Sequence, residues 1–408
     1  MKKHFQTMVC VISIVILLAL ALPGISCAGT EVIKSSNYAK NIIFMVPDGM
    51  GLYNVTAARI FKNGPDGNPL YLETLPQIGY QRTHSRNSTV TDSAAAAAAW
   101  ACGEKFNNNE ISCHDNDGDK VCDTNGSPAT ILELAKQSGK ATGLVATSTI
   151  SHATPAVWAA HVHYRNCETE IARQYIEVTG VDVILGGGIG SNQAGKNCEQ
   201  YLGQDKNAVI SSAISRGYEY VINKSEMEAA VAARKNKILG LFTASGKTPE
   251  TYRIDPIVYS WNEEEPTLPE MTAAALDILE EDKDGFFLMV EGSQIDWANH
   301  DNDITYQIGE TLAFDESVGV VLDWINAEPS RKNHTLVIIV ADHDCGGFAV
   351  NGPYGSLSNA GDIVEAGWTS GDHTAGDTII WSQGPGSHYL GKALDNTDLF
   401  SIMKKVLR

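Results

Sequence analysis

Short, almost continuously apolar runs recur along the chain, and helical patterns separate them. The clearest runs occupy residues 42–46, 144–147, 181–185, 286–290 and 336–340. Apolar runs of this length are typical of strands buried on both faces, as in a parallel sheet. The helical patterns occupy residues 130–137, 269–281 and 306–325. This alternation predicts an α/β fold, a three-layer αβα sandwich with a large, mostly parallel central sheet.

The first 28 residues have the pattern of a signal peptide. A basic start at Lys2 and Lys3 precedes an apolar segment over residues 9–22. That segment is too short to span a bilayer, which takes roughly 20 apolar residues, but it suits a signal-peptide core. The alternative is a lipoprotein signal with a lipid anchor at Cys27. We therefore expect an exported protein, periplasmic, extracellular or on the cell surface, with residues 29–408 as one domain.

The cysteines fit an oxidising compartment better than a cysteine-rich metal site, because their spacing matches no C-x-x-C zinc pattern. Cys113 and Cys122 flank a short acidic loop, and we expect them to form one disulfide. Cys167 and Cys198 are the second expected pair. Two further cysteines lie inside apolar segments and should be free and buried: Cys102 and Cys345.

Composition limits the function classes. The chain has 30 Lys+Arg against 49 Asp+Glu, a formal net charge of −19, and 43% hydrophobic residues. This apolar content excludes a disordered chain. The acidic balance argues against a nucleic-acid-binding surface, which needs a basic patch. It suits a soluble protein or one that holds cations.

Acidic residues and a histidine follow three of the predicted strands. Asp48, Glu291 and the pair Asp342-His343 each come directly after an apolar run. Ligands of open α/β sheets bind outside the carboxyl ends of the strands, so these side chains should meet at one edge. A single acid at such a place is more often a helix cap or turn former. Several together predict a cation site.

Two other segments extend this set. Asp296 and His300 are four residues apart, so on a helix they share a face and can bind one metal, although surface Asp–His pairs are common. His373 lies in a glycine-rich segment, where a lone histidine is usually a surface residue. Together these residues form a histidine and carboxylate set without cysteine, which suits zinc.

Ser93 is the candidate nucleophile. It precedes six alanines at residues 94–99, and Gly103 is a plausible end for the helix that they predict. A helix N-terminus favours an anion, although Asp92 or Ser93 could simply cap the helix. No G-x-S-x-G motif supports an esterase. A serine beside divalent cations can instead be activated by metal coordination.

In this order, residues 47–51, 91–95, 291–300, 341–343 and 373–374 resemble the motifs of the alkaline phosphatase family. The resemblance runs through almost the whole mature chain. It implies hydrolysis of phosphate monoesters of broad specificity through a phosphoserine, with two Zn²⁺ and a third metal, usually Mg²⁺. Family members are often homodimers, so a homodimer is also expected.

The resemblance assigns a role to each matching residue. Ser93 matches the nucleophile and Arg165 the phosphate clamp, for which a bidentate guanidinium is well suited. One zinc is assigned to Asp296, His300 and His373. The other zinc, facing Ser93, is assigned to Asp48, Asp342 and His343. The third metal is assigned to Asp48, Thr154 and Glu291, with His152 beside it.

Two positions depart from the best-studied bacterial pattern. His152 stands where that pattern has an aspartate near the third metal, and Trp297 stands where it has a lysine that reaches toward phosphate. The identity of the third metal is therefore open, and we expect weaker binding of the phosphate product.

An acidic insertion at residues 107–127 is a candidate calcium site. Four aspartates there could converge as oxygen ligands for Ca²⁺: Asp115, Asp117, Asp119 and Asp123. The spacing is not that of an EF-hand. The alternative is a solvated, acidic turn closed by a disulfide.

Two other function classes compete with a phosphomonoesterase. One is a phosphodiesterase or sulfatase on the same scaffold, but no Cys/Ser-x-Pro-x-Arg motif of a sulfatase is present. The other is a non-catalytic, calcium-dependent surface protein, which only the acidic insertion and the export signal favour.

Overall fold

The computed structural model describes residues 38–123, 127–188, 198–201, 204–251 and 262–408. The predicted signal peptide at residues 1–28, with the candidate lipid anchor at Cys27, lies outside these residues, as do residues 124–126 of the acidic insertion. Within the described part, none of the helices combines the length and the apolar character needed to cross a bilayer.

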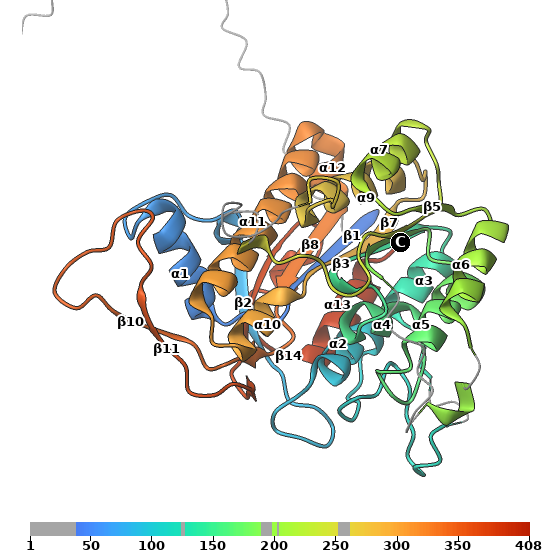
Figure 1. The fold of residues 1–408 in the computed structure, drawn as a ribbon, viewed down its shortest axis with the longest axis horizontal. Helices are drawn as coiled ribbons and strands as arrows, with labels where there is room; N and C mark the ends of the chain where they lie inside the picture. Colours follow the sequence, from blue (N-terminus) through green and yellow to red (C-terminus); the bar gives the residue numbers. More distant parts are fainter. Residues whose placement is uncertain (1–37, 124–126, 189–197, 202–203, 252–261) are drawn as a thin grey trace, which may run out of the picture. The chain divides into compact units, whose positions relative to one another are not determined.

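A ten-stranded sheet forms the centre of the fold (Figure 1). Its spatial order is β14 (Ala393–Asp395), β2 (Gln77–Arg82), β13 (Thr378–Gln383), β8 (Thr335–Val340), β1 (Asn41–Pro47), β7 (Phe286–Gly292), β3 (Ala141–Thr149), β4 (Val183–Gly187), β6 (Ile238–Leu241) and β5 (Glu219–Val221). Neighbouring strands are parallel except where β13 pairs with β2 and with β8. The mostly parallel sheet expected from the sequence is confirmed.

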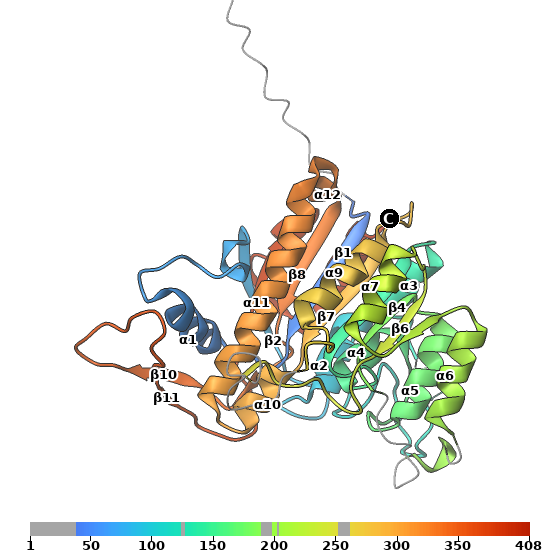
Figure 2. The ribbon, with the colours of Figure 1, turned by 45° about the horizontal axis from the view of Figure 1, so that its top comes forward.

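Helices cover both faces of the sheet (Figures 1 and 2). One hydrophobic core joins the sheet to α2 (Ser93–Cys102), α3 (Ile131–Gln137), α4 (Ala153–Ala159), α5 (Glu168–Gln174), α6 (Lys206–Ser215) and α13 (Asn396–Val406). A second core joins the opposite face to α1 (Leu52–Asn63), α7 (Lys224–Ala232), α9 (Leu268–Leu279), α10 (Gln294–His300) and α11 (Ile304–Ala327), which α12 (Pro329–His334) follows.

Strand β1 shows why the apolar runs are continuous. Phe44 belongs to the first core, where it contacts Trp100 and Trp158, whereas Met45 belongs to the second. Alternate side chains of a strand point to opposite faces, so a strand with a core on each side is apolar at nearly every position. All seven residues of β1 are buried.

The three helices expected from the sequence correspond to α3, α9 and α11. Helices α3 and α9 each begin with a capping box. In this motif the side chain of the N-cap threonine accepts from the backbone N–H three residues later, and the glutamate there accepts from the backbone N–H of the threonine. The residues are Thr130 and Glu133 in α3, and Thr267 and Glu270 in α9. These local signals explain why the starts of α3 and α9 agree closely with the sequence pattern.

Two small two-stranded sheets lie outside the main sheet. Strand β10 (Ala349–Gly352) pairs with β11 (Glu365–Gly367), and β9 (Asp344–Cys345) pairs with β12 (His373–Thr374). The second sheet contributes to the site described below, because Cys345 and His373 are register partners in it.

Both expected disulfides are present, Cys113–Cys122 and Cys167–Cys198. The two remaining described cysteines, Cys102 and Cys345, are free and buried, as expected. Two disulfides are typical of a protein that resides in an oxidising, extracytoplasmic compartment.

Candidate active site

Three adjacent strands, β8, β1 and β7, carry the predicted acidic residues to one edge of the sheet. Val46 of β1 pairs with Glu291 of β7, so Asp48, two residues further on, lies just beyond the same edge. Asp342 and His343 follow β8, which is the other neighbour of β1. All four of these polar side chains are fully buried, so the strand ends meet as the sequence predicts.

His343 lies at the centre of this group. Its Nε2 atom is 3.1 Å from Asp342 Oδ2, 3.6 Å from Asp48 Oδ1 and 3.2 Å from Ser93 Oγ. The backbone N–H of Gly49 donates to Asp342 Oδ1 at 3.2 Å. Gly49 has φ +68°, and a Cβ there would lie 2.7 Å from the Asp296 carboxylate, so only glycine fits this turn.

Two carboxylates of this pocket, those of Asp48 and Glu291, are buried without hydrogen bonds to either oxygen among the described residues. Burial, together with the charges of Asp342, Asp296 and Glu291, raises the pKa of Asp48 well above its usual range. Burial also raises the pKa of Glu291 to about 7. Buried, unpaired acids of this kind are stable when they bind cations, so the donor set fits divalent metals.

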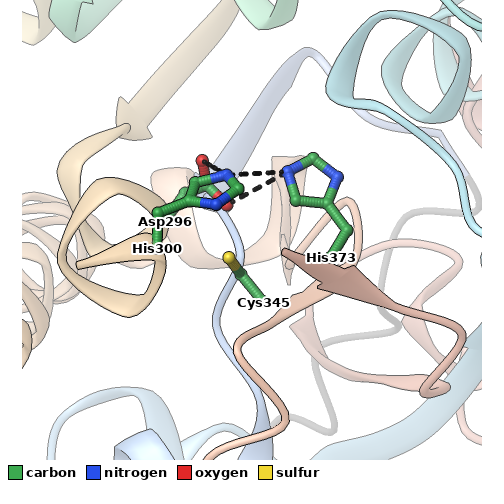
Figure 3. Close-up of side chains that lie close together, drawn as sticks. All are labelled: Asp296, His300, Cys345 and His373. Atoms are coloured by element: carbon green, nitrogen blue, oxygen red, sulfur yellow. Dashed lines mark hydrogen bonds and ion pairs between the residues drawn. The ribbon is translucent and has the colours of Figure 1, made fainter. Parts of the chain in front are cut away.

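A second group forms on α10 and β12. Asp296 and His300 share a helix face, with His300 Nε2 at 3.3 Å from Asp296 Oδ2. His373 Nε2 lies 3.5 Å from Asp296 Oδ1 and 3.2 Å from His300 Nε2 (Figure 3). Asp296 and His300 therefore share a helix face, as their spacing indicates, and His373 lies beside them.

Backbone carbonyls set the orientation of both imidazoles. His300 Nδ1 donates to Gly371 O at 2.7 Å, and His373 Nδ1 donates to Thr91 O at 2.9 Å. In a neutral imidazole with a protonated Nδ1, Nε2 carries the lone pair. At 3.2 Å the two Nε2 atoms either share a proton or bind a common metal ion. A hydrogen bond from Nδ1 to a carbonyl, which leaves Nε2 facing the metal, is common for metal-binding histidines.

The sequence predicted metal-ligating residues without a cysteine, but the structure places one beside this group. The Cys345 sulfur and the ligand atoms of Asp296, His300 and His373 all lie within 4.8 Å of one another (Figure 3). Cys345 was missed because only the pairing of β9 with β12 brings it opposite His373. Burial and the negative charge of Asp296 raise the pKa of its thiol in the absence of a cation.

Asp296 also faces the first group. Its Oδ1 atom lies 4.0 Å from His343 Nδ1, and its carboxylate shares a second potential metal group with Asp48 and His343. The His343 and His373 rings stack with centroids 3.5 Å apart. The two groups are therefore contiguous, with Asp296 common to both.

Ser93 begins α2, and its side chain is free to face His343 because Asp92 provides the helix cap. The Asp92 carboxylate accepts from Ala95 N at 3.0 Å. It also accepts from Arg165 Nη1 at 2.9 Å, which holds the guanidinium at the residue that precedes Ser93. This pairing could not be predicted from the sequence, because 73 residues separate the partners and no local pattern connects them.

His152 and Thr154 lie at the N-terminus of α4, where His152 contacts this arginine. His152 Nε2 is 3.2 Å from Arg165 Nη2, and burial, aided by the arginine charge, lowers the pKa of His152 to about 3. Its ring meets the Trp297 ring edge-on, with centroids 6.3 Å apart. The buried Thr154 hydroxyl has no hydrogen-bond partner in the described part of the chain.

The acidic insertion brings together three of its four predicted aspartates. Carboxylate oxygens of Asp115, Asp117 and Asp123 lie within 4.8 Å of one another. The Asp119 carboxylate instead accepts from Val121 N at 2.9 Å. Exposed acidic turns often have such geometry without an ion, so calcium binding stays a prediction from the sequence.

Comparisons with known proteins agree with this geometry. The family model described as alkaline phosphatase matches residues 39–360. Alkaline phosphatase 3 of Bacillus subtilis is 31% identical over a 487-residue alignment that covers 100% of this chain and 98% of that protein. The cold-active alkaline phosphatase of Shewanella sp. superimposes with a TM-score of 0.73 at 27% identity, covering 90% of this chain and 100% of that one.

A further solved structure is a variant of TAB5 alkaline phosphatase, with aspartate in place of a histidine and magnesium bound in its M3 site. It matches with a TM-score of 0.72 at 27% identity, over 90% of this chain and 98% of that one. Family model, curated relative and solved structures agree with one another over most of the chain. The protein therefore belongs to the alkaline phosphatase family and is a phosphoric monoester hydrolase.

Proposed function

We propose that the protein is an exported phosphomonoesterase of broad specificity that forms a phosphoserine at Ser93. The observation that carries this proposal is the position of Ser93 Oγ, at a helix N-terminus and 3.2 Å from His343 Nε2, beside an arginine oriented by Asp92. A nucleophile, a cationic clamp and a set of potential metal ligands thus converge on one small volume.

We further propose three metal sites at this edge. One zinc is held by Asp296, His300 and His373, and the other by Asp48, Asp342 and His343. Magnesium is held by Asp48, Thr154 and Glu291. The unpartnered oxygens of Asp48, Glu291 and Thr154 support these assignments. When bound, such ions polarise phosphoryl oxygens and stabilise the charge that develops in the transition state.

The protein's own groups position the phosphate. The Arg165 guanidinium, fixed by Asp92, binds two phosphoryl oxygens, and the free N–H groups at the start of α2 attract the anion. Ser93 Oγ then bonds to phosphorus as the ester P–O bond breaks, and the alcohol leaves with a proton. In the second step a water oxygen bonds to phosphorus, and Ser93 recovers its hydroxyl proton as phosphate is released.

Specificity for monoesters is the first test. The proposed arginine clamp and metal ions bind non-bridging phosphoryl oxygens, of which a monoester dianion has three and a diester monoanion only two. Turnover of 4-nitrophenyl phosphate should therefore greatly exceed that of bis(4-nitrophenyl) phosphate. A burst of nitrophenol with acid-trapped phosphate on Ser93 is expected. Faster hydrolysis of the diester would instead favour a phosphodiesterase on the same scaffold.

Replacing Trp297 with lysine should tighten phosphate inhibition. The indole lies next to Asp296 on α10 and packs against Gly246, and lysine there would add a positive charge near the bound anion. We expect the phosphate inhibition constant to fall by about three- to tenfold, as one partly screened charge contributes on the order of 1 kcal/mol. Trp297→Phe is the control that removes the indole without adding charge, and a fall with that variant would contradict the explanation.

Replacing His152 with aspartate should make activity depend more strongly on magnesium. His152 is neutral at physiological pH because burial lowers its pKa to about 3, whereas aspartate would supply an anionic oxygen ligand, which magnesium prefers. The TAB5 variant with a histidine-to-aspartate change and magnesium in its M3 site supports this expectation. Titration of the metal-depleted enzyme with magnesium should give a lower half-saturating concentration for His152→Asp. His152→Asn, which adds no charge, should not show this change.

We also propose that residues 1–28 direct export and that the mature protein forms a homodimer. Mass spectrometry of the mature N-terminus would distinguish cleavage before Gly29 from lipid attachment at Cys27. Light scattering of the purified mature chain would give its oligomeric state.

A further inference from the structure

We propose that the Cys345 thiolate is a fourth protein ligand of the zinc held by Asp296, His300 and His373. The inference rests on the proposed function, because it concerns one of the metal sites assigned there. It goes further by adding a sulfur donor to a site that otherwise has only imidazole and carboxylate donors.

The position of the sulfur is set by the backbone. Cys345 and His373 are register partners in the antiparallel pair of β9 and β12, and directly opposed residues of such a pair project to the same face. The N–H of Cys345 donates to Gly49 O at 3.1 Å, which fixes β9 against the turn after β1. As Figure 3 shows, the thiol then points toward Asp296 and His300.

The surroundings of the sulfur fit a cation. Cys345 is completely buried, and its sulfur lies within 4.8 Å of one ligand atom from each of the other three residues. Asp296 is only 5% exposed, and its Oδ1 atom has no hydrogen-bond partner within the described residues. The Nε2 atoms of His300 and His373 converge on the same space, with both Nδ1 atoms already bonded to carbonyls.

The chemistry of the donors also favours this assignment. Thiolate, imidazole and carboxylate are all zinc ligands, usually in tetrahedral geometry, and a thiol that coordinates zinc is deprotonated outright. When zinc binds, the Cys345 thiol would lose its proton to solvent. The resulting thiolate would place one more negative charge beside the cation. Four protein ligands should hold this zinc more tightly than three, and zinc can expand to five ligands, which leaves a position for a phosphoryl oxygen.

X-ray absorption at the zinc edge tests the proposal directly. The full mature chain, loaded with zinc alone, should show zinc–sulfur scattering at about 2.3 Å in addition to nitrogen and oxygen at about 2.0–2.2 Å. Cys345→Ala should lose the sulfur contribution and bind zinc at least about tenfold more weakly at this site. Cys102→Ala, which removes the other free buried thiol, should keep both properties.

The outcomes separate the inference from the function on which it rests. Wild-type protein that binds zinc with nitrogen and oxygen scattering only would overturn the role of Cys345 and leave the phosphomonoesterase intact. Wild-type protein that binds no zinc would overturn both. If Cys345→Ala does not fold, cobalt-substituted wild type decides alone, because only a thiolate ligand gives an intense sulfur-to-cobalt charge-transfer absorption.

Discussion

Ser93→Ala is expected to lower kcat/KM for 4-nitrophenyl phosphate by at least about a thousandfold, since it removes the proposed nucleophile. The same change should lower the free energy of unfolding by only about 1 kcal/mol, the usual contribution of one hydrogen bond, here the one with His343. Ser93 is the first residue of α2, but the cap hydrogen bond comes from Asp92, and alanine is the best helix former. Steady-state kinetics and thermal unfolding on the same preparation measure both effects.

Ser317→Ala is the matched control for this experiment. Ser317 is also a buried serine on a helix, and its hydroxyl donates to Ala313 O within α11, among residues of the second core. We expect a small loss of stability and full activity from this variant. If Ser93→Ala retained most of its turnover, or if it unfolded like a destabilised variant, the assignment of Ser93 as the nucleophile would be wrong.

Removal of the metals should have the second large effect. Dialysis against a chelator is expected to abolish turnover and to lower Tm by several degrees, and zinc with magnesium should restore both. An ion present at a thousand times its Kd contributes about 4 kcal/mol to folding. Without it, the buried carboxylates of Asp48 and Glu291 have no hydrogen-bond partner within the described residues. Activity assays and calorimetry before and after dialysis measure these changes.

The metal-free protein should also become less stable as pH rises. Burial raises the pKa of Glu291 from 4.5 to about 7, so the folded state keeps a proton that the unfolded state has lost. The stability present below about pH 4.5 is therefore lost as pH rises to about 7. The metal-loaded protein should lack this decline, because the cations compensate the ionised carboxylates. A metal-free Tm that stayed level from pH 5 to pH 8 would contradict this account.

The sequence predicted the centre of the fold well because local patterns determine it. Strands such as β1 and β8 are buried on both faces, and their acidic neighbours necessarily follow them to one edge. The outer part of the sheet was not predicted. Strand β2 alternates between buried and exposed residues and carries polar side chains, and β5 has only three residues. Neither gives a continuous apolar run.

The parts of the candidate site that were missed depend on contacts between distant segments. Asp92 and Arg165 meet only when the loop after α4 packs against the start of α2. Cys345 reaches the histidine group only through the pairing of β9 with β12, two strands of two residues each. Strands this short leave no periodicity in the sequence, and their side chains cannot be placed before the fold is known.

The shared position of Asp296 has a consequence for metal uptake. One of its carboxylate oxygens lies 3.5 Å from His373 and 4.0 Å from His343, so the same charge serves both proposed zinc positions. An ion in either position changes the electrostatic field and the ligand geometry at the other position. An ion at one position changes the affinity of the other position by a certain factor. The same factor applies in the reverse direction, whichever ion binds first. Zinc titrations should therefore follow a binding curve with coupled constants, and Asp296→Asn should change both of them.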